Sequence, residues 1–464
     1  MAALGAYIRS QGLTFGMYSA IGNQTCAHRP GSAGHEALDA ATYISWGVTW
    51  LKLDNCDYPN WDPATLYGAW SEALNAQPYR LALAVKAVVN YSTALAVGAA
   101  SRRVGGDVSA SWGDLLGLAY MAEPLWQQAR AGSYASGTSS FWTDVELVQV
   151  GNGDLTPGQQ RAHFYLWCAM HAPLMLSTKI AGLSPAQLAL LTNPETLAIN
   201  HDAAGAQAHR LGYQRIAAST PKPPLTPMAF GCSLQSSPAP SQGQAWALVP
   251  TPTPTSPTFQ LQLQLNTSLC LLRPSCNGSS SSVVVLAPCE LGCDGGTGSL
   301  WQWAAGGGGG VESLGGGGGQ CLTMEPRVHT SKCVPGGTAY QSLTYTPATG
   351  QLAMNFTGSG AAGDYTGYPQ CLDVLLGMSG ELWGSGLSDG SMAVVALNPS
   401  GQGVQMSIDA AALAAALGLR NAGDFKKLKA VRDVGERVSL SNASSTFEVA
   451  VNGTDAAILR ITPT

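Results

Sequence analysis

The sequence predicts a parallel α/β domain followed by two β-rich domains. Three observations predict this division. Between residues 10 and 210, short apolar runs alternate with helical patterns, which is typical of parallel βαβ units. After residue 210 the chain becomes rich in proline and glycine, and a cysteine pattern recurs. From about residue 381, alternating apolar runs such as "MAVVALN" and "AAILRI" predict a small antiparallel β domain.

Six apolar runs are the predicted strands of the first domain: "LTFGMYSA", "WLKLDNC", "YRLALAV", "RRVGGDV", "FWTDVELV" and "PLMLST". The intervening segment 34–47 predicts a helix, because apolar residues recur there at helical spacing and Gly47 suits its end. Thr156 and Pro157 predict the start of another helix, as N-cap and first helical residue. A closed (β/α) barrel needs eight strands, so these runs are two short.

The middle segment contains a three-fold repeat. Cysteines in "SLCLLRP", "GQCLTME" and "PQCLDVL" lie 51 and 50 residues apart, and each follows an aromatic segment. Repetition at this period predicts radial or trefoil β structure. The proline-rich run "VPTPTPTSPT" predicts a loop, and so do the two runs of five glycines at 306–310 and 315–319. The cysteines and aromatic residues of the repeat are Cys270, Cys289, Cys321, Cys333, Cys371, Trp246, Trp301 and Tyr345.

Composition narrows the classes of partner. The net charge of −5 argues against nucleic acid and against an anionic membrane surface, and no apolar run is long enough to cross a bilayer. The eleven cysteines lack paired C-x-x-C spacing, so zinc is not expected. Many cysteines beside several N-x-S/T sequons favour the secretory route, with an extracellular, vacuolar or lysosomal destination. The sequons are Asn23, Asn90, Asn266, Asn277, Asn355, Asn442 and Asn452.

Carboxylates end several predicted strands. Lys52 and Asp54 in "WLKLDNC" are two residues apart, so they point the same way. In a parallel barrel such residues face the active site, where a lysine would keep the carboxylate ionised and able to attack a sugar carbon. A buried structural ion pair is the competing interpretation. Asp107, four residues after Arg103, would supply the second carboxylate that glycoside hydrolysis requires. It could equally be an ordinary loop aspartate.

A third cluster, "FWTDVELV", puts Trp142, Asp144 and Glu146 on one face of a strand. An aromatic ring beside carboxylates suits a sugar, which has apolar C–H faces and hydroxyl donors. It would also suit a strand end that faces solvent.

These motifs resemble the α-galactosidases of glycoside hydrolase family 27. The matching stretches begin with "GLTFGMYSAIGNQTCAHRPGSAGHEALDAATYISWGVTWLKLDNC" and continue through "RRVGGDVSASW", "FWTDVELVQVGNG" and "NPETLAINHDAAGAQ". The resemblance covers residues 1 to about 210 and resumes at about 381. It implies a (β/α)8 barrel of the TIM type without its first two βα units, and hence an N-terminus that is incomplete.

The resemblance also implies roles. Asp54 matches the family's nucleophile and Asp107 its acid/base. Tyr18, Lys52 and Arg103 match residues of the family's sugar site, and Glu146 stands where the family usually has an aspartate. Trp142 and Asp144 are sugar-binding candidates from the third cluster alone. Cys26 and Cys56 match a family disulfide. The implied reaction is retaining hydrolysis of a terminal α-linked galactoside, with carbohydrate as the partner and neither metal nor organic cofactor.

Departures from the family pattern leave alternatives open. Val85 stands in "AVK" where the family has an acid that faces the sugar's 2-position, and Ala20 and Arg102 replace an aspartate and a tryptophan. The family's paired aspartates for the 4- and 6-hydroxyls are absent. The alternatives are therefore a catalytically impaired carbohydrate-binding protein, or a related α-glycosidase for a sugar such as α-N-acetylgalactosamine.

The repeat has its own resemblance, to ricin-B-type β-trefoil lectins, through "QCLTME", "PQCLDVL" and "LWQW". It implies disulfides Cys270–Cys289 and Cys321–Cys333, and a possible glycan ligand. An insertion that folds but binds nothing is equally compatible. The expected domains are a barrel over 1–210, a trefoil-like insertion with low-complexity loops over 211–380, and an antiparallel β domain over 381–464.

Overall fold

A computed structural model of the chain describes most of its residues. The described ranges are 1–58, 62–126, 141–215, 227–231, 246–251, 258–264, 266–273, 284–289, 299–303, 310–314, 319–324, 328–333, 341, 343–347, 351–354, 370–374, 378–440 and 444–464. The sequons Asn277, Asn355 and Asn442, and most of both glycine runs, lie outside them.

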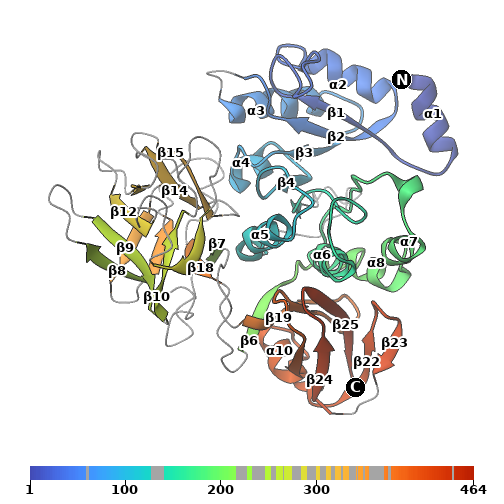
Figure 1. Cartoon of the computed structure of the whole chain (residues 1–464). Coiled ribbons are helices and arrows are strands. Elements are labelled where there is room, and N and C mark those ends of the chain that lie inside the picture. Colours follow the sequence, from blue (N-terminus) through green and yellow to red (C-terminus); the bar gives the residue numbers. More distant parts are fainter. Residues whose placement is uncertain are drawn as a thin grey trace.

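The first part of the chain is built on a parallel sheet (Figure 1). Its strands pair in chain order, each parallel to the next. The sixth predicted run contributes one parallel bridge, from Val148 to Leu176, rather than a strand. In the described ranges the sheet therefore runs from β1 to β5 and does not close into an eight-stranded barrel. The strands are β1 (Phe15–Ala20), β2 (Val48–Asp54), β3 (Ala82–Val85), β4 (Ser101–Arg103) and β5 (Trp142–Asp144).

Helices alternate with these strands, as the sequence predicts. The expected helix over 34–47 is α2, and Gly47 follows it with a φ of +76°, a conformation that glycine adopts without steric cost. Thr156 caps α6 in a capping box with Gln159, and Pro157 is the first helical residue. The helices are α1 (Ala2–Ser10), α2 (Glu36–Ser45), α3 (Pro63–Asn75), α4 (Tyr91–Ala96), α5 (Trp112–Ala122), α6 (Pro157–Ala169), α7 (Pro185–Leu191) and α8 (Pro194–Asn200).

The C-terminal part is antiparallel, as expected. Its larger sheet has the order β23-β22-β25-β20-β19-β6, and β21 pairs with β24. The predicted runs "MAVVALN" and "AAILRI" lie in β20 and β25. The strands are β6 (His209–Arg215), β19 (Met378–Gly386), β20 (Met392–Asn398), β21 (Val404–Asp409), β22 (Leu428–Asp433), β23 (Val438–Leu440), β24 (Thr446–Val451) and β25 (Asp455–Pro463), with α10 (Ala410–Ala416) after β21.

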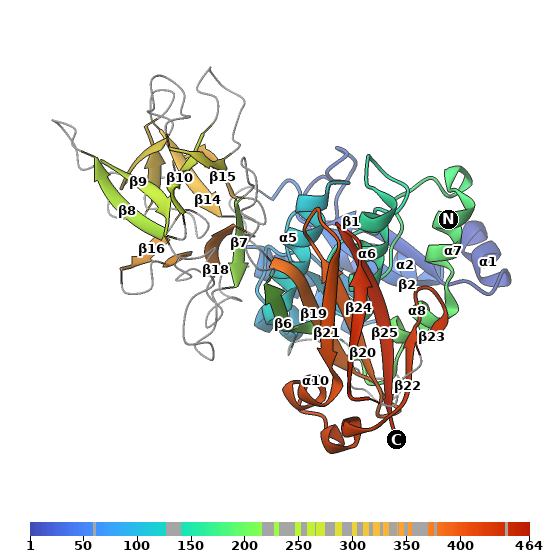
Figure 2. The same cartoon turned by 60° about the horizontal axis from the view of Figure 1, so that its bottom comes forward.

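Helix α6 joins the two parts, because it lies between the parallel sheet and the C-terminal sheet (Figures 1 and 2). Almost every side chain of α6 after its first turn is buried, as expected of a helix enclosed on more than one face. One apolar core therefore contains Trp167 of α6, Leu53 of β2 and Ile458 of β25. Arg161 of α6 adds an ion pair with Asp455.

The middle segment is an insertion in the C-terminal sheet. Strands β6 and β19 pair directly, from Arg215 with Met378 to His209 with Gly384, so the chain leaves after Arg215 and returns at Met378. The domain boundary expected at residue 210 is therefore too early. It falls inside β6, which belongs to the C-terminal sheet because it pairs with β19. The first and last residues of the insertion must lie side by side, because they continue from the paired strands β6 and β19. A β structure that closes on itself meets this requirement.

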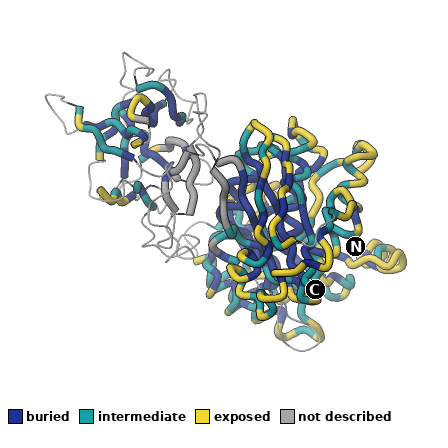
Figure 3. The backbone as a smooth tube through the Cα atoms, turned by 90° about the horizontal axis from the view of Figure 1, so that it is seen from below, coloured by how far each residue is buried: buried dark blue, intermediate teal, exposed yellow. Residues whose placement is uncertain are grey.

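The insertion has its own apolar core, separate from that of the parallel domain (Figure 3). Its strands form one sheet with the path β11-β10-β9-β12-β13-β14-β15, on which β8 also pairs with β9, and a second sheet β16-β17-β18-β7. They are β7 (Pro227–Gly231), β8 (Trp246–Thr251), β9 (Thr258–Leu263), β10 (Asn266–Leu272), β11 (Val285–Pro288), β12 (Leu300–Trp303), β13 (Val311–Ser313), β14 (Gln320–Met324), β15 (Val328–Lys332), β16 (Leu343–Thr346), β17 (Gln351–Met354) and β18 (Gln370–Val374).

No helix in the described part of the chain has the length and apolar character needed to span a bilayer.

Candidate active site

The charged residues of the parallel domain gather at one edge of its sheet, where strands β1 to β5 end. Asp54 is the last residue of β2, Arg103 the last of β4 and Asp144 the last of β5. Parallel pairing aligns these ends, with Ala20 opposite Asp54 and Arg103 opposite Asp144. Parallel topology therefore puts ionisable groups from distant parts of the sequence at one edge.

Asp54 is buried and held on both carboxylate oxygens. Its Oδ2 accepts a hydrogen bond from the Tyr18 hydroxyl at 3.2 Å and lies 3.8 Å from the Lys52 Nζ. Its Oδ1 accepts from the backbone N–H of Asn55 at 3.0 Å and lies 3.5 Å from the Lys86 Nζ. These contacts fix the position of the Asp54 carboxylate and balance its negative charge. A buried carboxylate without such partners would cost free energy.

Tyr18 completes this side of the site from β1. It is the register partner of Lys52, whose Nζ lies 5.6 Å from the centre of the Tyr18 ring. Burial and, to a smaller extent, the neighbouring Asp54 carboxylate raise the pKa of the Tyr18 hydroxyl. The phenol therefore stays protonated and donates a hydrogen bond to Asp54. Tyr18 as a residue is 41% exposed and thus offers an accessible wall beside the carboxylate.

Asp107, in the loop after β4, shares a cation with Asp54. Its Oδ1 lies 2.8 Å from the Lys86 Nζ and 3.1 Å from the Arg103 Nη2. The hydrogen bond from Lys86 and the charges of Lys86 and Arg103 hold the pKa of Asp107 at about 2, below its usual range. Its side chain is 81% exposed, against 10% for that of Asp54.

The position of Lys86 bounds the separation of the two carboxylates. Its Nζ lies 3.5 Å from the Asp54 Oδ1 and 2.8 Å from the Asp107 Oδ1, so these oxygens cannot be further apart than the two contacts laid end to end. The limit applies to this one pair of oxygens, and it allows the about 5–5.5 Å separation of carboxyl groups in retaining glycosidases.

Arg103 and Glu146 form a buried support for this pair. The Arg103 Nη1 lies 2.5 Å from the Glu146 Oε1, and both side chains are at least 95% buried. Glu146 was expected on the strand face of Trp142 and Asp144, but β5 ends at Asp144 and Glu146 lies beyond it. Its φ of +80° breaks the alternation of the strand and is strained for a residue other than glycine. Asp144 accepts from the Glu146 N–H at 2.8 Å, and burial raises the pKa of the Asp144 carboxyl. Asp144 and Glu146 therefore both lie at the edge of the sheet where strands β1 to β5 end.

Trp142 lies deeper in the same strand. It is the first residue of β5, opposite Ser101, and its ring is nearly parallel to that of His171, with centroids 6.1 Å apart. It shares the face of Asp144, as the alternation predicts, but its ring contacts His171.

Three residues that complete the site were not among the sequence candidates. Lys86 links the two carboxylates. Tyr67 donates to the Leu53 carbonyl at 3.0 Å and accepts from the Lys86 N–H at 3.2 Å. Arg102 donates to the carbonyls of Val89 at 2.6 Å and Ala87 at 3.3 Å. A signal for Lys86 was present, because it directly follows a predicted parallel strand. Nothing local to the sequence marked Tyr67.

The three implied disulfides are present: Cys26–Cys56, Cys270–Cys289 and Cys321–Cys333. The first joins the loops that follow β1 and β2, next to Asp54. Its two sulfurs and an Asp54 oxygen lie within 4.8 Å of one another, but disulfide sulfurs have no thiolate to offer a metal. Cys168 is a buried free thiol whose pKa is raised by burial, which makes it an unreactive core residue.

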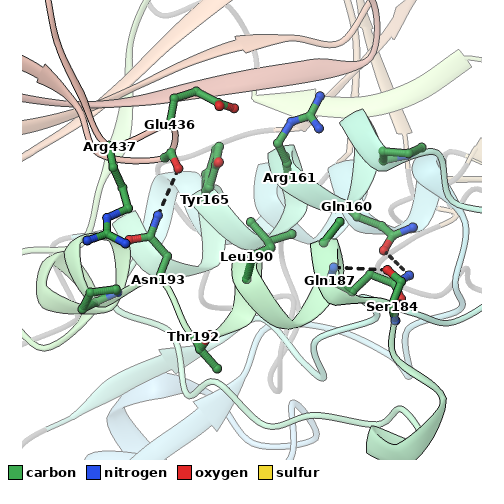
Figure 4. A pocket seen from close by; sticks show the side chains of 15 residues that line it. Gln160, Arg161, Tyr165, Ser184, Gln187, Leu190, Thr192, Asn193, Glu436 and Arg437 are labelled. Carbon is green, nitrogen blue, oxygen red and sulfur yellow. Dashed lines mark hydrogen bonds between the residues drawn. The ribbon is translucent and has the colours of Figure 1, made fainter.

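A cavity of about 590 Å³ lies elsewhere, between α6, α7, α8 and the turn from β22 to β23 (Figure 4). None of the sequence candidates lines it. Its polar wall groups are engaged with one another: Asn193 donates to the Val434 carbonyl at 2.8 Å, and Gln187 donates to Gln160 at 3.0 Å. The chemistry of the site edge is therefore the stronger functional signal.

Known proteins resemble the part of the chain that contains this edge. Residues 1–202 match the family model described as alpha galactosidase A. Alpha-galactosidase A of Cellvibrio japonicus is 35% identical over 219 residues, which are 45% of this chain and 52% of that protein. The alpha-galactosidase of Coffea arabica is 35% identical over 212 residues, 45% and 54% respectively. The chain thus spans about half the length of these relatives.

Solved structures share the fold. Alpha-galactosidase I from Mortierella vinacea superposes with a TM-score of 0.57 at 16% identity, covering 100% of this chain and 80% of that one. The α-galactosidase from Saccharomyces cerevisiae gives 0.56 at 15% identity, covering 100% and 83%. Fold similarity and the sequence match of the first domain agree. Residues 1–202, which hold the charged site edge, thus match the family model described as alpha galactosidase A and resemble α-galactosidases in sequence.

Proposed function

We propose that this chain is a retaining glycoside hydrolase that releases terminal α-linked galactose from oligosaccharides or glycoconjugates. The observation that carries the proposal is the pair Asp54 and Asp107, which one ammonium contacts at 3.5 Å and 2.8 Å, an arrangement that allows the carboxyl separation of retaining glycosidases. The match of residues 1–202 to the alpha galactosidase A family model supports galactose as the sugar. A relative of the same fold was solved with raffinose, which supports a carbohydrate substrate.

In the first step, an Asp54 oxygen attacks the anomeric carbon while the bond to the leaving oxygen breaks. Asp107 gives that oxygen a proton, and a glycosyl ester on Asp54 results. The buried, doubly anchored carboxylate of Asp54 suits a nucleophile, because its geometry is fixed before the substrate arrives.

In the second step, water attacks the same carbon and gives a proton to Asp107, and the Asp54 carboxylate leaves. The exposure of Asp107 suits this exchange with water and leaving group. Lys52, Tyr18 and Arg103 would bind sugar hydroxyls. Glu146 would act through Arg103, because its carboxylate lies against that guanidinium.

The test uses the purified chain and a fluorinated α-galactosyl fluoride that forms a slowly hydrolysed glycosyl ester. Peptide mapping should find one galactosyl adduct, on Asp54. Asp54→Asn should lose adduct formation and the hydrolysis of an aryl α-galactoside, since an amide is a far weaker nucleophile. Asp424→Asn, the same change at an exposed position of the C-terminal part, should retain both. An adduct elsewhere would overturn the role of Asp54.

A second function has one observation in its favour. Lys86 and Arg103 together neutralise Asp107, which would impair an acid catalyst and leave a site that binds carbohydrate without cleaving it. Under this alternative the chain would form no adduct and release no aryl group, yet would be retained on immobilised galactose. Turnover that is lost in Asp54→Asn would exclude it.

We also propose that the insertion, over about 211–380, is a β-trefoil-like module. Two equivalent hydrogen bonds support a repeat: the buried Trp246 donates to the Leu372 carbonyl, and the buried Trp301 to that of Leu271, both at 2.9 Å. In each case the acceptor directly follows a repeat cysteine. The first such bond joins the start of the insertion to its end, as a closed three-fold unit requires. Glycan binding by this module would appear as retention of an Asp54→Asn chain on glycan-coated beads.

The secretory route remains part of the proposal. The three disulfides of the described residues favour an oxidising compartment. Mass mapping of protein from its native source should find Cys26 and Cys56 joined, and free thiols at both would argue for a reducing compartment.

A further inference from the structure

Lys86 has no role in the reaction as described above, although it is the one residue that contacts both carboxylates among the described ion pairs. It directly follows β3, and its side chain is 12% exposed. Its ammonium lies 2.8 Å from the Asp107 Oδ1 and also 3.5 Å from the Asp54 Oδ1. In a retaining site, the leaving oxygen must come close to the Asp107 carboxyl group.

The backbone around Lys86 is built to hold it there. The Lys86 N–H donates to the Tyr67 hydroxyl, which itself donates to the carbonyl of Leu53, the residue before Asp54. Arg102 then holds the carbonyls of Ala87 and Val89 and lies 4.6 Å from the centre of the Tyr91 ring. Tyr67 and Arg102 are fully buried. The position of Lys86 thus follows from the buried core and not from a surface rotamer.

Every neighbouring element contributes a charged or titratable group near Asp107. These are Tyr18 from β1, Lys52 and Asp54 from β2, Lys86 after β3, Arg103 from β4 and Glu146 after β5. Of these, the two cations in direct contact with Asp107 are Lys86 and Arg103. Arg103 also pairs with Glu146, so Lys86 is the cation whose removal would change Asp107 most.

The two steps of retaining hydrolysis need opposite states of Asp107. Loss of a basic leaving group needs the carboxylic acid, whereas activation of water needs the carboxylate. A cation in contact with Asp107 favours the carboxylate, and the low pKa of Asp107 agrees with this. A leaving group that departs as a stable anion needs no proton, so its loss is not slowed by Lys86.

We propose that Lys86 is a positioning and specificity residue that holds Asp107 as a base, so that the site discriminates strongly among galactosides by how readily the leaving group departs. This inference rests on the proposed glycosidase function. With α-galactosyl fluoride, Asp54 attacks the anomeric carbon and fluoride leaves with the bonding electrons. Water then replaces Asp54 at that carbon, and its proton goes to Asp107. With an alkyl galactoside the leaving oxygen must also take a proton from Asp107.

The experiment measures kcat/KM for α-galactosyl fluoride, 4-nitrophenyl α-galactoside and methyl α-galactoside across pH 3–8. The variants are Lys86→Met, Lys86→Arg and, as the matched control, Lys429→Met at an exposed position of β22. The readout is the ratio of kcat/KM for methyl galactoside to that for the fluoride. Any effect of Lys86 on Asp54 enters both values and cancels, because both substrates need the nucleophile.

Lys86→Met should raise this ratio at least about tenfold at pH 6, because each unit by which the pKa of Asp107 rises gives tenfold more acid. It should also extend the activity on methyl galactoside to higher pH. Lys86→Arg and Lys429→Met should keep the wild-type ratio. Equal changes for all three substrates in Lys86→Met would overturn the proposal and leave Lys86 a structural residue.

A direct titration makes the inference independent of turnover. The ¹³C signal of the Asp107 carboxyl, assigned by its loss in Asp107→Asn, should titrate at higher pH in Lys86→Met than in the wild type. Identical titrations would refute the inference. Absence of turnover in every form, including on the fluoride, would instead count against the proposed glycosidase, and the carboxyl titration would still decide the effect of Lys86.

Discussion

Tyr67→Phe tests whether the hydroxyl that links β2 to Lys86 matters for both stability and function. The ring stays, so the apolar core loses no volume, and only the hydroxyl is removed. The Leu53 carbonyl then loses its donor at 3.0 Å, and the Lys86 N–H loses its acceptor at 3.2 Å. Tyr67 is fully buried, so water does not readily replace the hydroxyl.

Leaving a buried donor or acceptor unpaired costs about 1–3 kcal/mol. We therefore expect Tyr67→Phe to lower the free energy of unfolding of the first domain by about 1–3 kcal/mol. Urea unfolding, followed by tryptophan fluorescence, measures this loss as a lower midpoint at unchanged slope. With less restraint on Lys86, the ratio of methyl galactoside to fluoride turnover should move in the direction expected for Lys86→Met, but by less.

The matched control is Tyr91→Phe, which removes another buried hydroxyl, one that donates to the Thr143 Oγ1 at 3.1 Å. We expect a loss of stability but an unchanged substrate ratio, because the ring that faces Arg102 remains. The reasoning is refuted if Tyr67→Phe is as stable as the wild type, or if both variants shift the ratio equally.

Three further predictions concern a disulfide, a titration and the insertion. Replacing Cys26 and Cys56 by serine opens a link across 30 residues, so the free energy of unfolding should fall by about 3–4 kcal/mol on the loop-entropy model; a change below about 1 kcal/mol in urea unfolding would contradict it. The pKa of the Asp107 carboxyl is lowered to about 2 in the folded protein, whereas an aspartate in the unfolded chain has a pKa of about 3.9. The ion pairs of Asp107 therefore stabilise the fold fully above about pH 3.9, and this stabilisation is lost as the pH falls through about 2. Asp107→Asn should thus be less stable than the wild type at pH 6, by at most about 1 kcal/mol because the side chain is exposed, with the gap closing from pH 4 downward. Trp301→Ala should destabilise the insertion by about 3–5 kcal/mol. Since the insertion has its own core, proteolysis should then cut within 216–377, while the proposed hydrolysis of aryl α-galactosides should remain.

The sequence was informative wherever one local rule decided the structure. Short apolar runs located the five strands of the parallel sheet among six predicted runs, and the period of two within "WLKLDNC" put Lys52 and Asp54 on one face. Capping chemistry located the start of α6 at Thr156. The sixth run gave only the Val148–Leu176 bridge, because an apolar run shows that a segment is buried and not which neighbour it pairs with.

The departures from the family pattern needed the tertiary structure for their meaning. In the sequence, Arg102 and the segment "AVK" are two unrelated changes, 16 residues apart. In the structure they belong together, because Arg102 holds the carbonyls of Ala87 and Val89, which flank the turn after Lys86. The contact exists because β3 and β4 are adjacent parallel strands, with Val85 opposite Arg102.

The sequence by itself determined which side chains of a strand share a face, since that depends on a period of two along a single segment. It therefore predicted that Lys52 and Asp54 point the same way at the end of their strand. Only the tertiary structure decided which cation lies between the two carboxylates. That choice depends on the reach of a long side chain from a third strand, on a buried hydroxyl from α3 and on the pairing of β3 with β4. The same holds for the insertion, whose place in the sheet follows from the pairing of β6 with β19 across residues 216–377, a contact that no local pattern encodes.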